Sequence, residues 1–136
     1  MNSYYVMPCN HPRKILVAGG EGEHATTAEL YDPATGQWSA SGDMMYGRHL
    51  HTASVLTNGQ VLVVGGAGDA NSTELYDPLT GEWTLTGTTK YPRRMHTATV
   101  LDDGRVLIVG GITGSGALLD TGEIYDPLTD RWTPTS

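Results

Sequence analysis

One pattern recurs three times in this 136-residue chain. A short apolar run ends in Gly-Gly and is followed by Glu-(Leu/Ile)-Tyr-Asp-Pro and then by a tryptophan. The Gly-Gly pairs begin at residues 19, 65 and 110, at intervals of 46 and 45 residues, and Trp38, Trp83 and Trp132 follow at intervals of 45 and 49. Repetition at this period is typical of architectures in which each copy buries its faces only against neighbouring copies. The repeat therefore constrains fold and assembly more than it constrains chemistry.

The first half of each copy predicts a β-hairpin. Residues 51–66 are identical to residues 96–111 at eleven of sixteen positions, and Asn58-Gly59 and Asp103-Gly104 lie between the two halves of these stretches. Asn-Gly and Asp-Gly between apolar runs indicate a type I′ turn, in which both central residues have positive φ. The second run, at residues 61–64 and 106–109 and at 15–18 in the first copy, is apolar at every position, which is typical of a strand covered on both faces. Other sheets should therefore lie on both sides of it.

The second half of each copy predicts two more strands. Strand three is expected at residues 28–31, 73–76 and 122–125, and strand four contains the tryptophan. Between them lies Asp-Pro-x-Thr-Gly, in which the Asp bonds the backbone ahead, the Pro presets φ and the Gly takes a left-handed conformation. The third copy has Asp130 in place of that glycine, a residue that tolerates this conformation at some cost. No segment shows a helical apolar period.

Taken together, the Gly-Gly pair, Tyr-Asp-Pro, the spaced Trp and the Arg-x-x-His before strand one resemble kelch repeats, the blades of a β-propeller. The resemblance covers the chain from about Tyr4 to Trp132. It implies an all-β fold of three blades with four antiparallel strands each, at about residues 4–42, 49–88 and 94–134, within a single unit spanning 1–136. The first copy departs from the pattern, because residues 5–12 stand where His-Thr-Ala and an Asn-Gly turn are expected. Its first strand would have a free edge, which tolerates Pro8.

Three blades raise a question of assembly. Propellers close with typically four to eight blades, so three alone would leave two apolar sheet faces uncovered. A head-to-tail dimer would close a six-bladed ring through a two-fold axis along the channel. The competing interpretations are a piece of a longer polypeptide, or half of a ring whose other half is a different chain. The expected partner is a second copy of the chain.

The loops on one face of the disc are the expected binding surface. In an up-and-down blade, the loop between strands two and three and the link from strand four to the next strand one lie on the same face, and variable loops on a rigid scaffold usually hold function. The former loops differ in length, and the latter are rich in Tyr, Arg and Met, residue types favoured at binding surfaces. Alternatively, Tyr46, Tyr91, Met44 and Met45 pack beneath the loops. The candidate binding residues are Tyr46, Arg48, His49, Tyr91, Arg93, Arg94, His24, Asp69 and Asn71.

Several recurring residues are predicted to be scaffold. His51 and His96 begin strand one near the channel, and a dimer would gather four imidazoles there, which suggests a metal site. A repeated hydrogen-bonding role is the favoured interpretation, so no metal site is predicted. Glu29, Glu74 and Glu123 recur with Arg48 and Arg93, which favours inter-strand charge pairs over catalysis. The three tryptophans and the three strand-three tyrosines are expected to be core residues.

Composition excludes some partners. A net charge of −7 opposes binding to nucleic acids and acidic membranes, and no apolar run reaches membrane-spanning length. The single cysteine, Cys9, allows neither a disulfide framework nor a thiolate metal cluster. We expect the chain to be soluble. Its N-terminus lacks the basic region and long apolar core of a signal peptide, and the sequence does not indicate a cellular compartment.

Three functions are compatible with these residues. A non-catalytic propeller that binds a protein, a small ligand or a carbohydrate is favoured, because the chain has no Gly-x-Ser-x-Gly elbow, phosphate loop or metal-binding helix motif. No cofactor is predicted. The alternative is half of a larger kelch enzyme resembling galactose oxidase or a sugar isomerase, although the Tyr-His dipeptide expected of such oxidases is lacking. The third is a structural fragment without a ligand. The fold alone does not decide among them.

Overall fold

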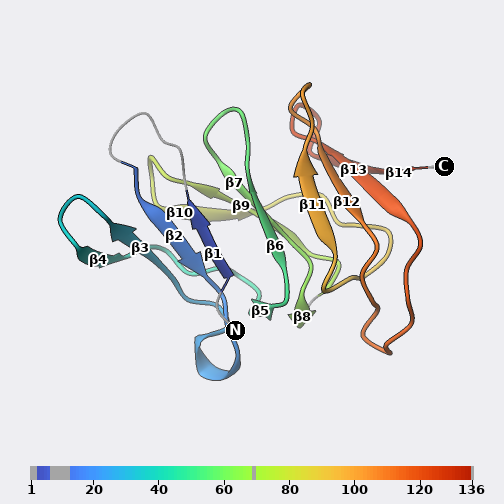
Figure 1. Ribbon diagram of the computed structural model, residues 1–136, viewed down its shortest axis with the longest axis horizontal. Helices are drawn as coiled ribbons and strands as arrows, with labels where there is room; N and C mark the ends of the chain where they lie inside the picture. Colours follow the sequence, from blue (N-terminus) through green and yellow to red (C-terminus); the bar gives the residue numbers. More distant parts are fainter. Residues whose placement is uncertain (1–2, 7–12, 69, 136) are drawn as a thin grey trace.

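The computed structural model describes residues 3–6, 13–68 and 70–135, and the described chain contains three four-stranded antiparallel sheets arranged side by side (Figure 1). We call these sheets blades 1, 2 and 3. The strands of blade 1 are β1 (Ser3–Val6), β2 (Ile15–Ala18), β3 (Ala28–Asp32) and β4 (Gln37–Ala40). Those of blade 2 are β6 (Thr52–Val55), β7 (Val61–Val64), β9 (Thr73–Asp77) and β10 (Glu82–Leu85). Those of blade 3 are β11 (Thr97–Val100), β12 (Val106–Val109), β13 (Gly122–Asp126) and β14 (Arg131–Pro134).

Each blade is an up-and-down meander, as predicted. The strands pair in chain order in all three sheets, and the second strand of each has the predicted bounds. A two-stranded ladder between β5 (Arg48–His49) and β8 (Ala67–Gly68), which the sequence did not predict, joins the link before blade 2 to the loop within it. The only helix among the described residues is the 3-10 turn η1 (Gly22–His24), so the described chain has no helix that could span a membrane.

The predicted hairpins form, but the prediction of a type I′ turn is wrong. The Leu56 N–H donates to the Gln60 carbonyl at 2.8 Å and the Gly59 N–H donates to the Leu56 carbonyl at 2.9 Å, so three residues form the loop. Gly59 has a φ of +87°, whereas Asn58 does not have positive φ. This is a type I turn followed by a left-handed glycine, the usual three-residue hairpin loop. The turn at Gly104 repeats the arrangement.

The Asp-Pro turns between the third and fourth strands form as predicted. The first Asp of each turn accepts a hydrogen bond at 2.9 Å from the backbone N–H two residues ahead. Gly36 and Gly81 have positive φ, and Asp130, in the same position of blade 3, has a φ of +56°. The first strand of blade 1, whose sequence departs from the repeat pattern, also forms, because β1 pairs with β2 over four residues. The Pro8 and Cys9 positions lie outside the described residues.

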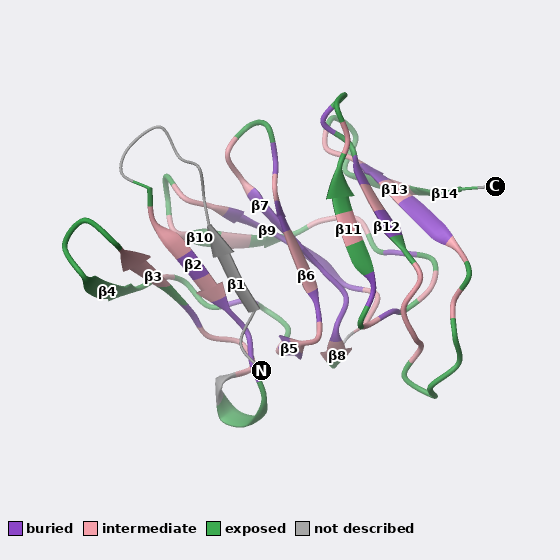
Figure 2. Cartoon of the chain, viewed as in Figure 1, coloured by how far each residue is buried: buried purple, intermediate pink, exposed green. Residues whose placement is uncertain are grey.

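The core consists of two layers, one between each pair of neighbouring blades. In the first seam, Leu16, Ala18 and Met44 of blade 1 and its link meet Val61 and Val63 of blade 2. In the second seam, Leu62 and Val64 meet residues of blade 3, among them Val106, Ile108 and Tyr125. All four residues of β7 are buried, whereas burial alternates along β2 and is incomplete along β12 (Figure 2). Blade 2 is therefore covered on both faces, and blades 1 and 3 are covered on one.

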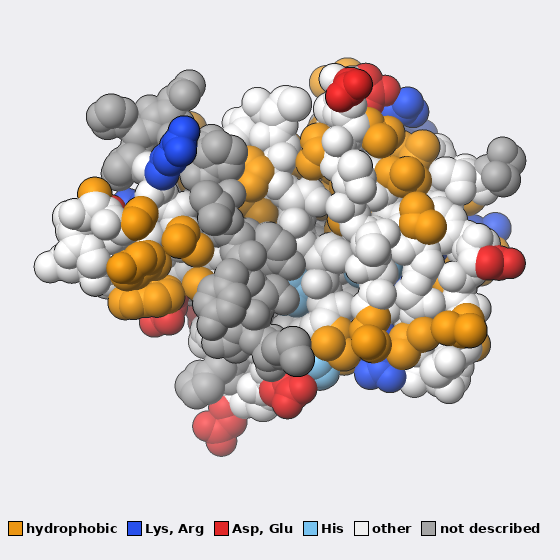
Figure 3. Space-filling view, in the orientation of Figure 1, with side chains coloured by type: hydrophobic (Ala, Val, Ile, Leu, Met, Phe, Trp, Pro, Cys, Tyr) orange, Lys and Arg blue, Asp and Glu red, His pale blue; other side chains and the backbone are white. Residues whose placement is uncertain are grey.

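The two outer faces of the row remain apolar. The face of blade 1 that points away from blade 2, here called the leading face, contains the apolar residues Ile15, Val17, Tyr31 and Trp38, with Glu29 opposite Val17. The opposite face of blade 3, the trailing face, contains Leu101, Leu107, Val109 and Ile124. Trp38 is 55% exposed and Val109 44%, and hydrophobic side chains gather over β3 and β4 at one end of the row (Figure 3). The prediction that all three tryptophans are core residues is therefore wrong for Trp38, because no blade of this chain covers the leading face.

Candidate functional site

The loops expected on one face do lie together, and we call their surface the loop face. The β5–β8 ladder and the bridge between Arg94 and Ile112 each join a link to the following loop. The N–H groups of Gly20 and Gly66 donate at 3.0 Å to the carbonyls of Arg48 and Arg93, respectively. These hydrogen bonds connect blades 1 and 2 to the links that follow them. Figure 1 shows β5, β8 and η1 along one edge of the row, opposite the β6–β7 and β11–β12 turns. The loop face is thus held by backbone bonds.

A buried arginine anchors the link before blade 2. The Arg48 guanidinium donates to the Gly65 carbonyl at 2.8 Å, to the Ser72 carbonyl at 3.1 Å and to the Glu74 carboxylate at 2.8 Å. The same carboxylate accepts the backbone N–H groups of Met45 at 2.7 Å and Tyr46 at 3.3 Å. Both charged side chains are only 1% exposed. A buried ion pair is tolerated when further hydrogen bonds satisfy its members, as they do here.

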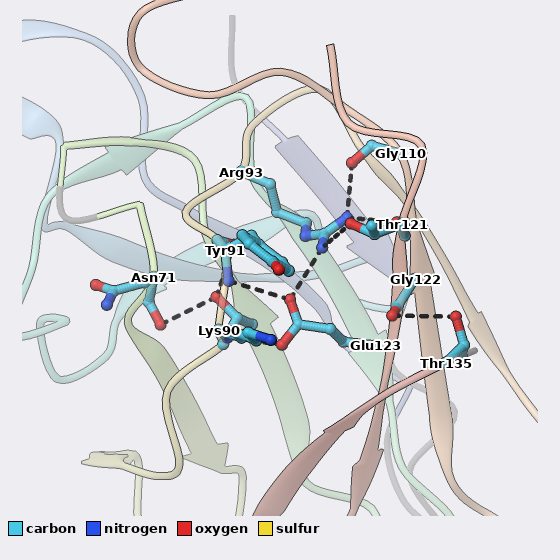
Figure 4. Close-up of polar contacts among 10 residues, drawn as sticks. Asn71, Lys90, Tyr91, Arg93, Gly110, Thr121, Gly122, Glu123 and Thr135 are labelled. Atoms are coloured by element: carbon cyan, nitrogen blue, oxygen red, sulfur yellow. Dashed lines mark hydrogen bonds and ion pairs between the residues drawn. The ribbon is translucent and has the colours of Figure 1, made fainter. Parts of the chain in front are cut away.

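The link before blade 3 is anchored in the same way (Figure 4). Arg93 donates to the carbonyls of Gly110 at 2.8 Å and Thr121 at 2.9 Å, and to the Glu123 carboxylate at 2.9 Å. Glu123 also accepts the N–H groups of Lys90 at 2.6 Å and Tyr91 at 3.4 Å. We call each such set of donors around a glutamate a glutamate clamp. The predicted charge pairs between the recurring Arg and Glu residues are confirmed for Glu74 and Glu123.

The clamps divide the candidate binding residues into two groups. Arg48 and Arg93 are buried within the clamps, so their side chains hold the scaffold and are not exposed on the loop face. Tyr46 is 37% exposed and Tyr91 is half-buried, and the clamps fix the backbone of both residues. The Lys90 ammonium lies 5.2 Å from the centre of the Tyr91 ring. Two rigidly held tyrosines at equivalent positions therefore remain on the surface.

The other candidates also lie on the loop face where the structure describes them. His49 is half-buried with its Nε2 3.9 Å from the exposed Glu21 carboxylate, Arg94 is half-buried at the bridge to Ile112, and Asn71 is half-buried with its carbonyl accepting from Thr89. His24 ends η1 on this side of the molecule. The Asp69 position lies outside the described residues.

His51 and His96 are scaffold residues directly before β6 and β11. Both are 6% exposed, and the Nε2 atom of His96 lies 2.7 Å from the Thr52 hydroxyl of the preceding blade, which supports the predicted hydrogen-bonding role for His96. Burial and the nearby Arg48 lower the pKa of His51 to about 3, and burial and Arg93 lower the pKa of His96 to about 4. Both imidazoles are neutral at pH 7. Among the described residues, no three His, Cys, Asp or Glu side chains come together as a metal site would require.

Sequence reasoning missed a cavity beside Glu29. It has a volume of about 500 Å³, and Gly19, Thr27 and Glu29 are among the residues that line it. We call it the Glu29 pocket. The recurrence of Glu29, Glu74 and Glu123 suggested one common role for all three. The spacing in the sequence could have distinguished Glu29 from the other two. Arg48 and Arg93 precede their glutamates by 26 and 30 residues, whereas Arg13 precedes Glu29 by only 16.

Comparison with known proteins supports the architecture. The sequence profile of the Kelch motif matches residues 93–136, which include all of blade 3. No curated protein matches the chain in sequence. Among solved structures, the chain is similar to the one titled "Structure of YjhT", a kelch-type propeller protein, with a TM-score of 0.80 and 17% sequence identity. The match covers 99% of this chain and 51% of that one, so this chain spans about half the length of YjhT. The predicted resemblance to kelch repeats is confirmed: residues 93–136 match the Kelch motif, and the described chain folds into three four-stranded blades like those of a β-propeller.

Proposed function

We propose that this chain is a non-catalytic propeller scaffold, that a second copy completes it to a six-bladed ring, and that it binds a protein, small-molecule or carbohydrate ligand through the loop face. The observation that carries the proposal is the pair of apolar end faces. An exposed apolar face of this kind on each end of one chain is typical of surfaces that a partner covers.

The leading and trailing faces are equivalent to surfaces that are buried elsewhere in the chain. Tyr31 and Trp38 occupy the positions of Tyr76 and Trp83, which lie in the first seam. On the trailing face, Leu107 and Val109 occupy the positions of Leu62 and Val64, which lie in the second seam. The leading face is therefore equivalent to one side of the seams between blades, and the trailing face is equivalent to the other side.

The leading face is also preorganised for such contact. The ring centres of Tyr31 and Trp38 are 4.9 Å apart with a 44° interplanar angle, and the pairs in the two buried seams differ little, at 5.0 Å and 45° and at 5.2 Å and 44°. Trp38 thus holds the buried geometry while it is exposed. A partner surface would gain contact with an aromatic pair that is already in place, at low cost in side-chain entropy.

Pairing leading face with trailing face is heterologous, and heterologous contacts give closed rings only when the rotation closes. Two three-blade chains would make six blades, which lies within the usual range for propellers. The 51% coverage of the YjhT structure supports the same count. In such a ring the loop faces of both copies point to the same side of the disc and form one continuous surface.

The chemistry of the loop face favours a binding role. Tyr46 and Tyr91 are aromatic anchors with little freedom, Met45 is 64% exposed beside Tyr46, and Arg94 and Asn71 supply polar contacts. Aromatic residues, Met and Arg are the types enriched at recognition surfaces. Tyrosine rings with neighbouring hydrogen-bonding groups suit both protein and sugar ligands.

Light scattering tests the ring. A mass twice the 14.5 kDa of the chain is expected. A folded species that stays at 14.5 kDa at all concentrations would overturn the dimer, and a larger complex with a different chain would point to a mixed ring.

Ligand binding is tested separately on a glycan array and against candidate proteins, with the wild-type chain and a Tyr46→Ala/Tyr91→Ala variant. A ligand whose binding falls at least about tenfold in the variant supports the loop face as the site. The matched control is Leu79→Ala, since Leu79 is 94% exposed in the turn between β9 and β10. Binding that the tyrosine variant leaves unchanged would overturn this part of the proposal.

A further inference from the structure

We propose that the Glu29 pocket binds a guanidinium group, presented as an arginine side chain on an extended peptide segment. Residues of blade 1 and the start of the following link form the pocket, so the inference does not depend on ring closure. It assigns a ligand chemistry to a cavity that neither Tyr46 nor Tyr91 lines.

The pocket repeats the lining of the two arginine sites. Gly19, Thr27 and Glu29 occupy in blade 1 the places of the residues that hold the buried arginines in the other blades. In those blades the acceptors are a glycine carbonyl, a Ser or Thr carbonyl and hydroxyl, and a glutamate carboxylate, at Gly65, Ser72 and Glu74 for Arg48 and at Gly110, Thr121 and Glu123 for Arg93. Thr27 provides the same atom types as Ser72 and Thr121.

The backbone of blade 1 already has the geometry of a filled site. The Gly19 N–H donates to the Thr27 carbonyl at 2.9 Å, and the equivalent bonds in blades 2 and 3 are both 3.1 Å. Glu29 lies opposite Val17 in the β2–β3 ladder, in the register that Glu74 has opposite Val63. The backbone carbonyls and the strand position of the glutamate therefore match those in the sites of Arg48 and Arg93.

Glu29 differs from its counterparts in its surroundings. Glu74 and Glu123 are completely buried, whereas Glu29 is exposed at the cavity. In the part of the chain that the structure describes, no ion pair and no hydrogen bond from a backbone N–H involves its carboxylate. The site thus combines an acceptor set that holds guanidinium elsewhere in the same molecule with open space beside it.

The clamps also define the form of the ligand. A planar guanidinium offers several donors in a fixed fork, which suits acceptors placed around one plane, whereas an ammonium is a point donor. Each clamp also uses the backbone N–H groups three and two residues before the arginine. The residue two before the arginine is Tyr in both links, at Tyr46 and Tyr91. The preferred ligand is therefore an arginine preceded, three and two residues earlier, by backbone N–H groups that can bond to Glu29, as in Lys90-Tyr91-Pro92-Arg93.

A peptide taken from the chain itself tests the inference. Residues 88–95, Thr-Thr-Lys-Tyr-Pro-Arg-Arg-Met, are synthesised with blocked ends and a fluorophore, and polarisation is measured on titration with protein. We expect saturable binding that weakens with salt, and a loss of about tenfold or more in affinity when the first Arg of the peptide, which corresponds to Arg93, is replaced by citrulline.

On the protein side, Glu29→Gln should weaken binding by a similar factor, while Glu82→Gln, a change at another exposed strand glutamate, should not alter it. Each variant is checked for native circular dichroism. The titration is repeated in Val109→Glu, which blocks the trailing face and leaves blade 1 unchanged, so that self-association cannot hide the pocket. Lack of binding in both backgrounds, or equal binding of the citrulline peptide, would overturn the proposal. Light scattering on the same samples reports ring closure independently.

Discussion

At the scale of single residues, the glutamate clamps show how one repeated residue type can have different roles. Glu74 and Glu29 share a repeat position, but Glu74 is buried with Arg48 and two backbone N–H groups, and Glu29 is exposed. Breaking a buried pair leaves an uncompensated charge, whereas removing an exposed carboxylate costs little.

Glu74→Gln should therefore lower the free energy of unfolding by about 3 to 5 kcal/mol, and Glu29→Gln should change it by less than about 0.5 kcal/mol. Urea denaturation of both variants measures the difference. Equal losses would mean that the clamp at Glu74 adds no stability beyond that of a surface residue.

The two buried histidines should make the free energy of unfolding depend on pH. Their pKa values fall to about 3 for His51 and about 4 for His96, below the ordinary value of 6.5, so between these values the unfolded chain binds more protons than the folded one. Stability is then complete above pH 6.5 and falls as the pH decreases from 6.5 towards 4, by an amount on the order of a few kcal/mol. Urea midpoints from pH 7.5 to 4.5 should show this slope, and His51→Asn/His96→Asn should flatten it. An unchanged slope in the double variant would assign the effect to other groups.

Asp130 shows what the sequence could and could not predict at this scale. Its left-handed conformation was expected from the glycines at the equivalent positions, and its φ of +56° agrees. The contact that favours an aspartate there is visible only in the structure, since the Tyr125 hydroxyl donates to Asp130 Oδ1 at 2.7 Å. Burial and this carboxylate raise the pKa of Tyr125 to about 12. The bond depends on a side-chain direction that a linear pattern does not contain.

At the scale of elements, the apolar pattern of the strands predicted their positions more accurately than the Asn-Gly and Asp-Gly pairs predicted the hairpin turn type. The fully apolar second strands were located to the residue, because an unbroken apolar run bounded by glycines has few other interpretations. The predicted type of the hairpin turn was wrong, because Asn58-Gly59 fits both a two-residue loop and the last two positions of a three-residue loop. Which one forms depends on the register between β6 and β7, and local sequence does not fix that register.

The Gly-Gly pairs allow a matched test of packing between elements. Gly65 and Gly110 both have positive φ, but a Cβ at Gly65 would lie 2.3 Å from the Arg93 carbonyl oxygen, and at Gly110 the nearest atom would be 3.6 Å away. Gly110→Ala should cost about 1 kcal/mol from backbone conformation alone, and Gly65→Ala about 3 kcal/mol or more. Thermal and urea unfolding of both variants give the comparison. Similar losses would show that the link beside Gly65 moves aside easily.

At the scale of the whole molecule, the unequal ends of the row make the assembly testable by complementation. Trp38→Glu on the leading face and Val109→Glu on the trailing face should each abolish the proposed dimer, because every seam between copies then contains a buried charge. A mixture of the two variants should form heterodimers, since one of the two seams then has neither substitution. Light scattering of the separate and mixed variants measures this outcome. Association of either variant alone, or none in the mixture, would contradict head-to-tail pairing.

The complete burial of β7 has a further consequence for how the molecule opens. In a row of units stabilised by their neighbours, terminal units open more readily than central ones. In the isolated chain, amide hydrogen exchange should be slowest in β7, faster in β2 and β12, and this gradient should be large enough to map by mass spectrometry. A ring has no terminal unit, so on closure the exchange rates of the three central strands should converge. The difference between the exchange rates of β2, β7 and β12 would thus show whether the three-blade chain has closed into a ring.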